Sequence, residues 1–260
     1  FSPVDKMNLV ELIKSERTND NALAVALDYT SLIKKTPIVV NDSRGFYANR
    51  CIIPYINEGL RMLSEGIEPA LIENSAKQIG MPVGPLQLLD ELSVSLALNV
   101  AKETKEALGT KYEETGTESI LLEMSQKNRL GRKELAGFYE YDKKGRRLKL
   151  WEGLRDLNIE KNSADISTVT VKNRLAYVQA LEAARALEEN ILLSVEEGDV
   201  GGILGWGCLI WAGGPFSWLD YIGHENVVVE CQYLSDQFGT RFNPPKIIKE
   251  LANSGRKFYN

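Results

Sequence analysis

The sequence repeats itself with a period close to half of its length, and this repeat restricts the possible folds more than any other feature. The matching positions are Asn49-Arg50 with Asn173-Arg174, Glu58 with Glu182, Arg61 with Arg185, Gly84-Pro85 with Gly214-Pro215, and Asp90 with Asp220. The offset is 124 residues at first and 130 afterwards, so one insertion of six residues explains the register. A period this long indicates two domain-sized copies, because the repeats of solenoids are shorter. We expect the two copies to pack their apolar faces together about a pseudo-twofold axis, as an isologous dimer does.

Hydrophobic periodicity predicts helices through most of each copy. An apolar stripe with the i, i+3, i+4, i+7 spacing of a buried helix is formed by Ile52, Ile53, Ile56, Leu60 and Leu63. Further helices are predicted over 69–79, 86–108 and 119–130, and the Leu-, Val- and Ala-rich run 86–108 is expected to be one long buried helix. The chain from residue 44 onward is therefore expected to be mainly α.

Residues 1–43 have a different pattern. Two β-branched apolar runs, 8–13 and 36–41, flank an amphipathic segment, 19–35, that Thr18 or Asn19 could cap. A strand–helix–strand unit of this size cannot close a sheet by itself. We expect it to be the edge of a larger α/β domain.

These patterns predict four segments. Residues 1–43 are the α/β edge, 44–141 the first helical copy and 162–260 the second, and the charged, glycine-bearing stretch 142–161 is the linker. The chain opens with Phe1-Ser2-Pro3, without Met and without a signal-peptide pattern. We expect a processed or excised piece of a longer protein.

Composition excludes several functions. The formal charge is −5 and no dense basic run occurs, which argues against nucleic-acid binding. The longest apolar stretch, 203–219, is broken by glycines and Pro215, so no membrane span is expected. Cys51, Cys208 and Cys231 are too widely spaced to suggest a metal site or a disulfide framework, which suits a reducing compartment.

Few residues suggest chemistry by themselves. The single histidine, His224, follows a glycine, and we interpret it as a residue of a loop or helix start. Nucleophile-elbow, phosphate-loop and dinucleotide-binding glycine motifs are missing from the sequence. The glycines of 201–207 are interpreted as a close helix contact because helical pattern flanks them.

Four segments carry a resemblance to a known family. Residues 1–13 contain Ser2-Pro3 and then Leu9-Val10-Glu11, 42–50 contain Gly-Phe-x-x-Asn-Arg, 80–90 contain Pro-x-Gly-Pro-x-x-Leu-x-Asp, and 131–141 contain Gly-Phe-Tyr-x-Tyr. In this order they resemble the L-3-hydroxyacyl-CoA dehydrogenases. The second copy further resembles the multifunctional fatty-acid oxidation proteins of the alpha-subunit type, in which this enzyme follows an enoyl-CoA hydratase.

The resemblance implies a fold and a site. The fold would be mainly α, with two tandem helical domains like the C-terminal domain of 6-phosphogluconate dehydrogenase after a short remnant of a Rossmann domain. Glu11 would orient the catalytic histidine, Asn49 would donate to the substrate oxygen, and Ser2 would shape the substrate entrance. We assign Asn173, the counterpart of Asn49, a structural role because the second copy has no Glu-bearing strand beside it.

The family's catalytic histidine falls two residues before Phe1, and its NAD loop lies further upstream. The resemblance therefore implies an NAD-dependent enzyme whose cofactor-binding domain is missing here, so this piece alone would bind no cofactor or metal and be inactive. Implied partners are an acyl-CoA substrate, the missing N-terminal and hydratase domains, and a thiolase subunit. We expect a monomer in the bacterial cytoplasm, with peroxisomes and mitochondria left open.

Two alternatives stay open. The helical part could belong to another β-hydroxyacid dehydrogenase, although the Gly-x-x-x-Asn-x-x-Lys pattern of that group is missing. It could also be a non-catalytic helical assembly module, in which Glu11 and Asn49 persist as structural residues.

Overall fold

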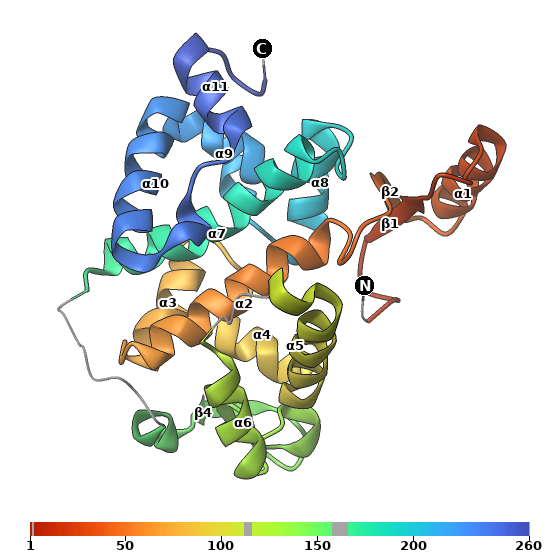
Figure 1. Ribbon diagram of the computed structural model, residues 1–260. Helices are drawn as coiled ribbons and strands as arrows, with labels where there is room; N and C mark the ends of the chain where they lie inside the picture. The colour runs from red at the N-terminus through yellow and green to blue at the C-terminus, as the bar shows by residue number, and fades with distance from the viewer. Residues whose placement is uncertain (2, 112–115, 158–165, 260) are drawn as a thin grey trace. The chain divides into compact units, whose positions relative to one another are not determined.

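The computed structural model describes residues 1, 3–111, 116–157 and 166–259. Within these ranges the chain is mostly helical, with two small two-stranded sheets (Figure 1), so the expectation of a mainly α fold is confirmed. It divides into two compact units. Unit 1 contains Phe1–Pro54, Ile79–Pro82 and Ala176–Asn260, and unit 2 contains Tyr55–Gln78 and Val83–Leu175.

Unit 1 begins with the predicted strand–helix–strand segment. Strand β1 (Leu9–Lys14) and strand β2 (Thr36–Asn41) pair in parallel, with Leu9 opposite Thr36, and helix α1 (Asp20–Leu32) connects them. Asn19 is the N-cap, because its side-chain oxygen accepts a hydrogen bond of 2.8 Å from the Ala22 amide.

The helices of unit 1 pack around a core of fully buried side chains that includes Cys51, Leu181, Phe216 and Leu219. The unit contains the start of α2 (Ala48–Ser64), the larger part of α7 (Thr168–Glu188), α8 (Val195–Trp206), α9 (Pro215–Ile222), α10 (His224–Phe238) and α11 (Lys246–Ser254).

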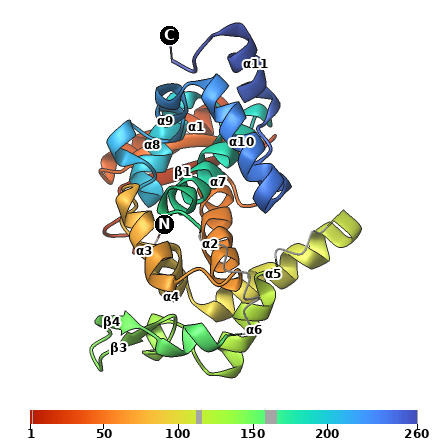
Figure 2. The same ribbon diagram turned by 90° about the vertical axis from the view of Figure 1, so that its left-hand side faces the viewer.

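Unit 2 has its own core around the buried side chains of Tyr55, Leu60, Leu86 and Phe138. It contains the rest of α2, α3 (Pro69–Gln78), α4 (Pro85–Leu92), α5 (Val94–Leu108), α6 (Glu118–Gln126) and an antiparallel hairpin of β3 (Tyr139–Tyr141) and β4 (Arg147–Leu150). Figure 2 shows this hairpin and α6 within the unit.

The prediction of one long buried helix over 86–108 is wrong. The chain breaks at Ser93, which has a left-handed φ of 93°, so α4 ends at Leu92 and α5 begins at Val94. The Ser93 hydroxyl accepts a hydrogen bond of 3.2 Å from the Leu96 amide and caps α5. Within the described side chains of α5 only Val94 is buried. The Leu-, Val- and Ala-rich pattern continues on both sides of Ser93, and Ser95 lies inside α5, so residue type alone does not distinguish the cap from the helix interior.

The stretch predicted as a linker is partly ordered. The turn of the β3–β4 hairpin, β4 and a short 3₁₀ helix (Glu152–Asp156) occupy its first residues. Residues 158–165 lie outside the described part of the chain. The four predicted domain boundaries remain predictions.

Each copy contains two buried carboxylates that accept hydrogen bonds from backbone amides and from a tyrosine hydroxyl. We call these pairs, Glu73 with Asp90 and Asp199 with Asp220, the carboxylate locks. The sequence repeat indicates only Asp90 and Asp220. In unit 2, Glu73 accepts hydrogen bonds from the Leu86 amide (2.9 Å) and the Tyr139 hydroxyl (2.7 Å). Asp90 accepts bonds from the Phe138 amide (2.8 Å) and the Tyr139 amide (2.9 Å). Glu73 and Asp90 thereby tie the start of α4 to strand β3.

Unit 1 repeats this arrangement with residues of the second copy. Asp199 accepts hydrogen bonds from the Phe216 amide (2.7 Å) and the Tyr259 hydroxyl (2.9 Å). Asp220 accepts bonds of 2.9 Å from the Phe258 and Tyr259 amides. The same four hydrogen bonds recur, which supports the predicted duplication at atomic detail.

The repeated Arg and Glu positions pair across the two copies. In unit 1, the Arg50 Nε donates to Glu182 over 2.8 Å. In unit 2, the Arg174 Nε donates to Glu58 over 2.6 Å. The arginine of each copy thus binds the glutamate of the other, which is the pattern of an isologous contact.

A candidate active-site edge around Glu11

The Glu11 carboxylate lies at the start of helix α2. Its Oε1 accepts hydrogen bonds of 3.0 Å from the Tyr47 and Ala48 amides. The first amides of a helix have no partner within the helix, and the helix dipole favours a negative charge there. Strand β1 and helix α2 therefore hold this carboxylate in a defined place.

Two opposing effects act on the pKa of Glu11. Burial raises the pKa of Glu11 above its usual value, and the amide bonds from Ala48 and Tyr47 act against that rise. Their donation stabilises the ionised carboxylate. A charge at this site is thus partly desolvated and kept in place by backbone donors.

Asn49 lies in the first turn of α2, directly after Ala48, and its side chain is exposed. The structure thus brings the Glu11 carboxylate to the helix turn that carries Asn49. Ser2 lies outside the described residues. Asn173 belongs to α7, and its structural role remains a prediction.

Tyr47 is the residue at this edge that sequence reasoning missed. Its side chain is fully buried, its hydroxyl donates to the Gly198 carbonyl over 2.9 Å, and its ring meets Trp206 edge-on at 5.5 Å between centroids. Both partners belong to α8, about 150 residues further along the chain. The only available signal was an aromatic residue between Phe46 and Asn49.

A cavity of about 250 Å³ lies beside Glu11. Its lining is mostly apolar and includes Leu9, Val10 and Phe46, with Lys35 at the wall. The Lys35 ammonium donates to the Val4 carbonyl over 2.8 Å. The carboxylate thus borders a small apolar space, where a substrate group could be kept from water.

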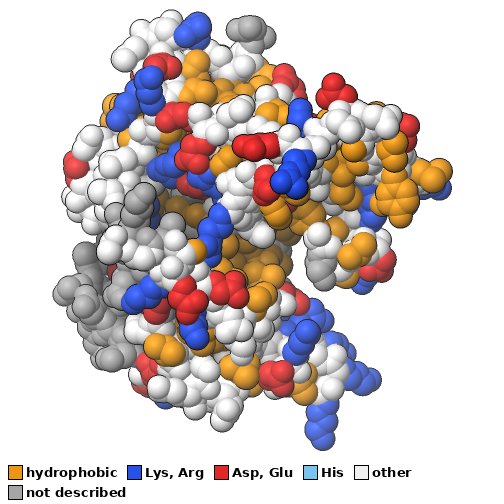
Figure 3. All heavy atoms as spheres, turned by 45° about the vertical axis from the view of Figure 1, so that its right-hand side comes forward, with side chains coloured by type: hydrophobic (Ala, Val, Ile, Leu, Met, Phe, Trp, Pro, Cys, Tyr) orange, Lys and Arg blue, Asp and Glu red, His pale blue; other side chains and the backbone are white. Residues whose placement is uncertain are grey.

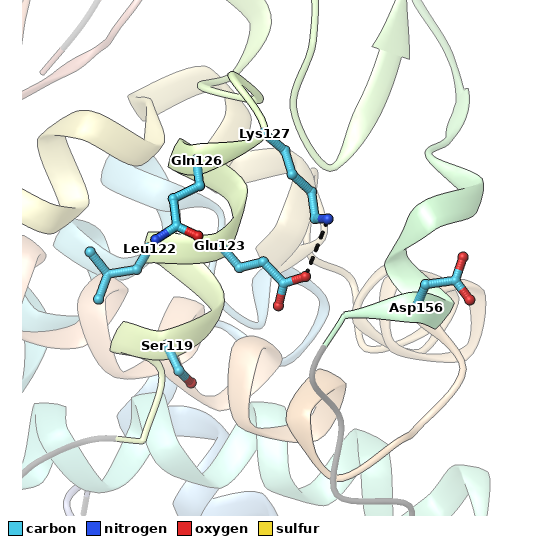
Figure 4. Close-up of a pocket in the computed structure, with 6 residues that line it drawn as sticks. All are labelled: Ser119, Leu122, Glu123, Gln126, Lys127 and Asp156. Atoms are coloured by element: carbon cyan, nitrogen blue, oxygen red, sulfur yellow. Dashed lines mark ion pairs between the residues drawn. The ribbon is translucent and has the colours of Figure 1, made fainter.

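A second, more open cavity of about 670 Å³ lies in unit 2, beside α6 and the 3₁₀ helix 152–156. Figure 4 shows its lining: Ser119, Leu122, Glu123, Gln126, Lys127 and Asp156. Its only drawn ion pair joins Glu123 and Lys127 at 3.5 Å, four residues apart on α6. This arrangement is typical of a solvated helix face, and we assign it no catalytic role.

His224 belongs to the carboxylate locks. Its ring is buried, its Nε2 lies 2.8 Å from the Asp220 carboxylate, and the Phe258 ring packs against it edge-on. At the offset of 130 residues, the counterpart of His224 is Val94. In the first copy the Tyr141 hydroxyl instead donates a hydrogen bond of 2.9 Å to Asp90, beside those of the Phe138 and Tyr139 amides. His224 therefore replaces Tyr141 as a structural donor.

The described residues contain neither the ligand cluster of a metal site nor the glycine-rich turn of a dinucleotide site. No group of three His, Cys, Asp or Glu that could hold a metal ion occurs among them. The connection from β1 to α1, residues 15–19, contains no glycine, so it does not form the phosphate-binding turn of a dinucleotide site. In the same part of the chain, no helix combines the length and apolarity that crossing a bilayer requires.

Comparison with known proteins agrees with the fold and with the motifs. The family model of the NAD binding domain of 3-hydroxyacyl-CoA dehydrogenase matches residues 1–43, and that of the C-terminal domain matches residues 45–141. The chain belongs to the 3-hydroxyacyl-CoA dehydrogenase family.

Solved structures share the fold over nearly the whole chain. The dehydrogenase part of multifunctional enzyme 1 from Caenorhabditis elegans is 26% identical with a TM-score of 0.70, and the match covers 96% of this chain and 57% of that one. 3-Hydroxybutyryl-CoA dehydrogenase from Escherichia coli is 19% identical with a TM-score of 0.75, covering 98% and 70%, which shows a shared fold. FadB2 from Mycobacterium tuberculosis is 28% identical with a TM-score of 0.50, covering 55% and 50%.

Proposed function

We propose that this chain supplies the substrate side and the self-association surface of an NAD-dependent L-3-hydroxyacyl-CoA dehydrogenase that oxidises 3-hydroxyacyl-CoA to 3-ketoacyl-CoA in fatty-acid β-oxidation. The observation that carries this proposal is the position of Glu11, held by two amides at the start of the helix that carries Asn49.

The geometry suggests a role for each side chain. One carboxylate oxygen of Glu11 holds the two amides, which leaves the other to hold the imidazole of the family's histidine in one tautomer and to stabilise its cation. Asn49, exposed in the adjacent turn, can donate its amide N–H to the substrate oxygen. Ser2 would lie at the entrance for the acyl-CoA substrate.

NAD would accept the hydride in this reaction, and we assign its binding to a part of the protein outside this chain. Two observations support this assignment: the β1–α1 connection lacks glycine, and apolar side chains of α1 are exposed. Val25, Tyr29 and Leu32 on α1 have 61%, 62% and 78% of their surface exposed, and Figure 3 shows hydrophobic side chains gathered on this segment. Further strands and helices of a nucleotide-binding domain would cover such a face.

The partners follow from the same proposal. The likeness to a part of a multifunctional enzyme suggests an N-terminal hydratase domain, and we extend this to an accompanying thiolase subunit. Cys51, Cys208 and Cys231 are all free and buried, which supports a reducing compartment such as the bacterial cytoplasm.

The test of the site is an NADH-linked assay of the full-length protein with acetoacetyl-CoA. Glu11→Gln should lower kcat by about 10²–10⁴-fold, because it removes the charge that orients and stabilises the base. Glu16→Gln is the matched control, since Glu16 is an exposed carboxylate after the same strand. Equal kcat values for Glu11→Gln and the unmodified protein would refute the proposed site.

The same assay tests the proposed division of the enzyme. The 260-residue chain alone should give no turnover above background, because it supplies neither the base nor the NAD loop. An inactive full-length protein that still assembles with partners would favour the non-catalytic assembly module instead.

A further inference from the structure

We propose that helix α8 of the second copy is part of the active-site scaffold, because it fixes the position of Glu11 through Tyr47. This inference rests on the proposed function and assigns the second copy a role beyond self-association. Tyr47 is then a positioning residue, which acts on the reaction through Glu11 without touching the substrate.

The first link joins α8 to Tyr47. The Tyr47 hydroxyl donates to the Gly198 carbonyl in the first turn of α8, and the Tyr47 ring packs edge-on against Trp206 at the end of α8. The side chain is thus anchored at two points more than two helical turns apart. A fully buried aromatic ring with both anchors has little freedom to move.

The second link joins Tyr47 to Glu11. The Tyr47 amide is one of the two donors to Glu11 Oε1, and the Ala48 amide that follows it is the other. The contacts of the Tyr47 side chain with α8 thus restrain the residue that carries the first donor and directly precedes the second. The place of the carboxylate therefore depends on a contact made by the second copy.

Glycines on α8 permit its close approach to this edge. A Cβ built at Gly201 would lie 2.8 Å from the Ile38 side chain and 3.0 Å from the Tyr47 ring. Both distances are shorter than ordinary contacts between carbon atoms. The glycine run that the sequence suggested as a helix contact thus faces strand β2 and Tyr47.

The second copy also pairs with the outer edge of β2. Glu197 in the first turn of α8 accepts a hydrogen bond of 2.9 Å from the Val39 amide. The Asn41 amide donates to the Ile191 carbonyl over 2.8 Å, and its side-chain amide donates to the Asn190 carbonyl over 2.7 Å. The unpaired amides of a strand edge are open to pairing with other segments. Here residues of the second copy accept hydrogen bonds from this edge beside Glu11.

The test uses the full-length protein and the variant Tyr47→Phe, which removes the bond to Gly198 and keeps the ring. We expect kcat for acetoacetyl-CoA to fall about 2–10-fold, the effect of one hydrogen bond. The acidic limb of the pH–rate profile should move to higher pH, because the amide bonds that oppose the rise in the pKa of Glu11 are loosened. The charged groups nearby, Lys35 in the same cavity and Asp199 near Tyr47, are unchanged.

Three further variants make the result specific. Tyr233→Phe is the control, since Tyr233 is an exposed tyrosine on α10. Glu197→Ala removes the hydrogen bond from the Val39 amide to α8 and should move the acidic limb of the pH–rate profile in the same direction. Glu197→Gln keeps an acceptor and should leave the limb where it is in the unmodified protein. A merely structural role would lower the melting temperature and leave the pH limb where it is.

The outcomes separate this inference from the proposed function. If Glu11→Gln lowers kcat while Tyr47→Phe and Glu197→Ala keep the kcat and the pH limb of the unmodified protein, the role of α8 is refuted and the proposed function stands. If Glu11→Gln has no effect on kcat, the proposed function is refuted, and the role of α8 is refuted with it.

Discussion

Replacing Arg174 with methionine should destabilise the protein far more than the equivalent change at Arg50. Arg174 and Glu58 have no exposed side-chain surface, and Arg174 also pairs with Glu65, whose side chain is 33% exposed. Arg174→Met removes the arginine that lies 2.6 Å from the buried Glu58 carboxylate, and Arg61 lies 3.6 Å from it. Removing one partner of a buried ion pair costs about 3–5 kcal/mol. For a chain of this size this is a fall of about 6–20 °C in melting temperature.

The repeat supplies the matched control. Arg50, at the same place in the first copy, has 16% of its side chain exposed, and its partner Glu189 has 52% exposed. Because water can reach that pair, Arg50→Met should cost about 1–2 kcal/mol. The double variant Arg174→Met/Glu58→Leu removes both buried charges and should recover most of the loss. Equal melting temperatures for the two single variants would show that burial does not set the cost of losing the arginine.

The remaining predictions concern the carboxylate locks. Asp90→Ala leaves the Phe138 and Tyr139 amides without their acceptor and should cost about 2–4 kcal/mol in thermal unfolding, whereas the exposed Asp236→Ala should cost less than about 0.5. Burial raises the pKa of Asp90 from 3.8 to about 6, so protonation of this carboxyl group stabilises the folded state. The stabilisation by protonation is complete below pH 3.8 and is lost as the pH rises through about 6. This contribution is about 3 kcal/mol, and Asp90→Asn should reduce the difference in melting temperature between pH 4 and pH 7. His224→Val, which introduces the residue found at the matched position of the first copy, should cost about 1 kcal/mol and leave kcat within about twofold, and a larger loss of kcat would contradict its structural role.

The repeat was visible in the sequence wherever residue type and offset were both kept. Asp90 and Asp220 meet both conditions, so the sequence alone indicates that they are equivalent. Glu73 and Asp199 differ in residue type and have an offset of 126, and Tyr139 and Tyr259 have an offset of 120. These pairs became recognisable only when their hydrogen bonds were seen to be the same.

Local pattern predicted the strand–helix–strand segment well, because alternation and capping are encoded within a few residues. It fails at Ser93, where one residue with a left-handed φ divides a Leu-, Val- and Ala-rich run into two helices. The contacts of the site lie beyond local pattern altogether. Glu197 and Val39 are 158 residues apart in the chain, and nothing near either residue indicates the other.

The motifs predict Glu11 and Asn49 as site residues, and the structure shows which contacts hold the Glu11 carboxylate at the start of the helix that carries Asn49. The carboxylate is held by the backbone that precedes Asn49, so one helix start positions both side chains. The contribution of Tyr47 could not be predicted, because its partner Gly198 is a glycine with no chemical signature of its own.

The most direct test is a crystal structure of the full-length protein with NAD and acetoacetyl-CoA bound. We predict that Glu11 Oε1 keeps its hydrogen bonds to the Tyr47 and Ala48 amides and that the other oxygen contacts the imidazole of a histidine. We also predict that Asn49 lies within hydrogen-bond distance of the C3 oxygen of the substrate. A Glu11 side chain or an Asn49 side chain that points away from the bound substrate would contradict it.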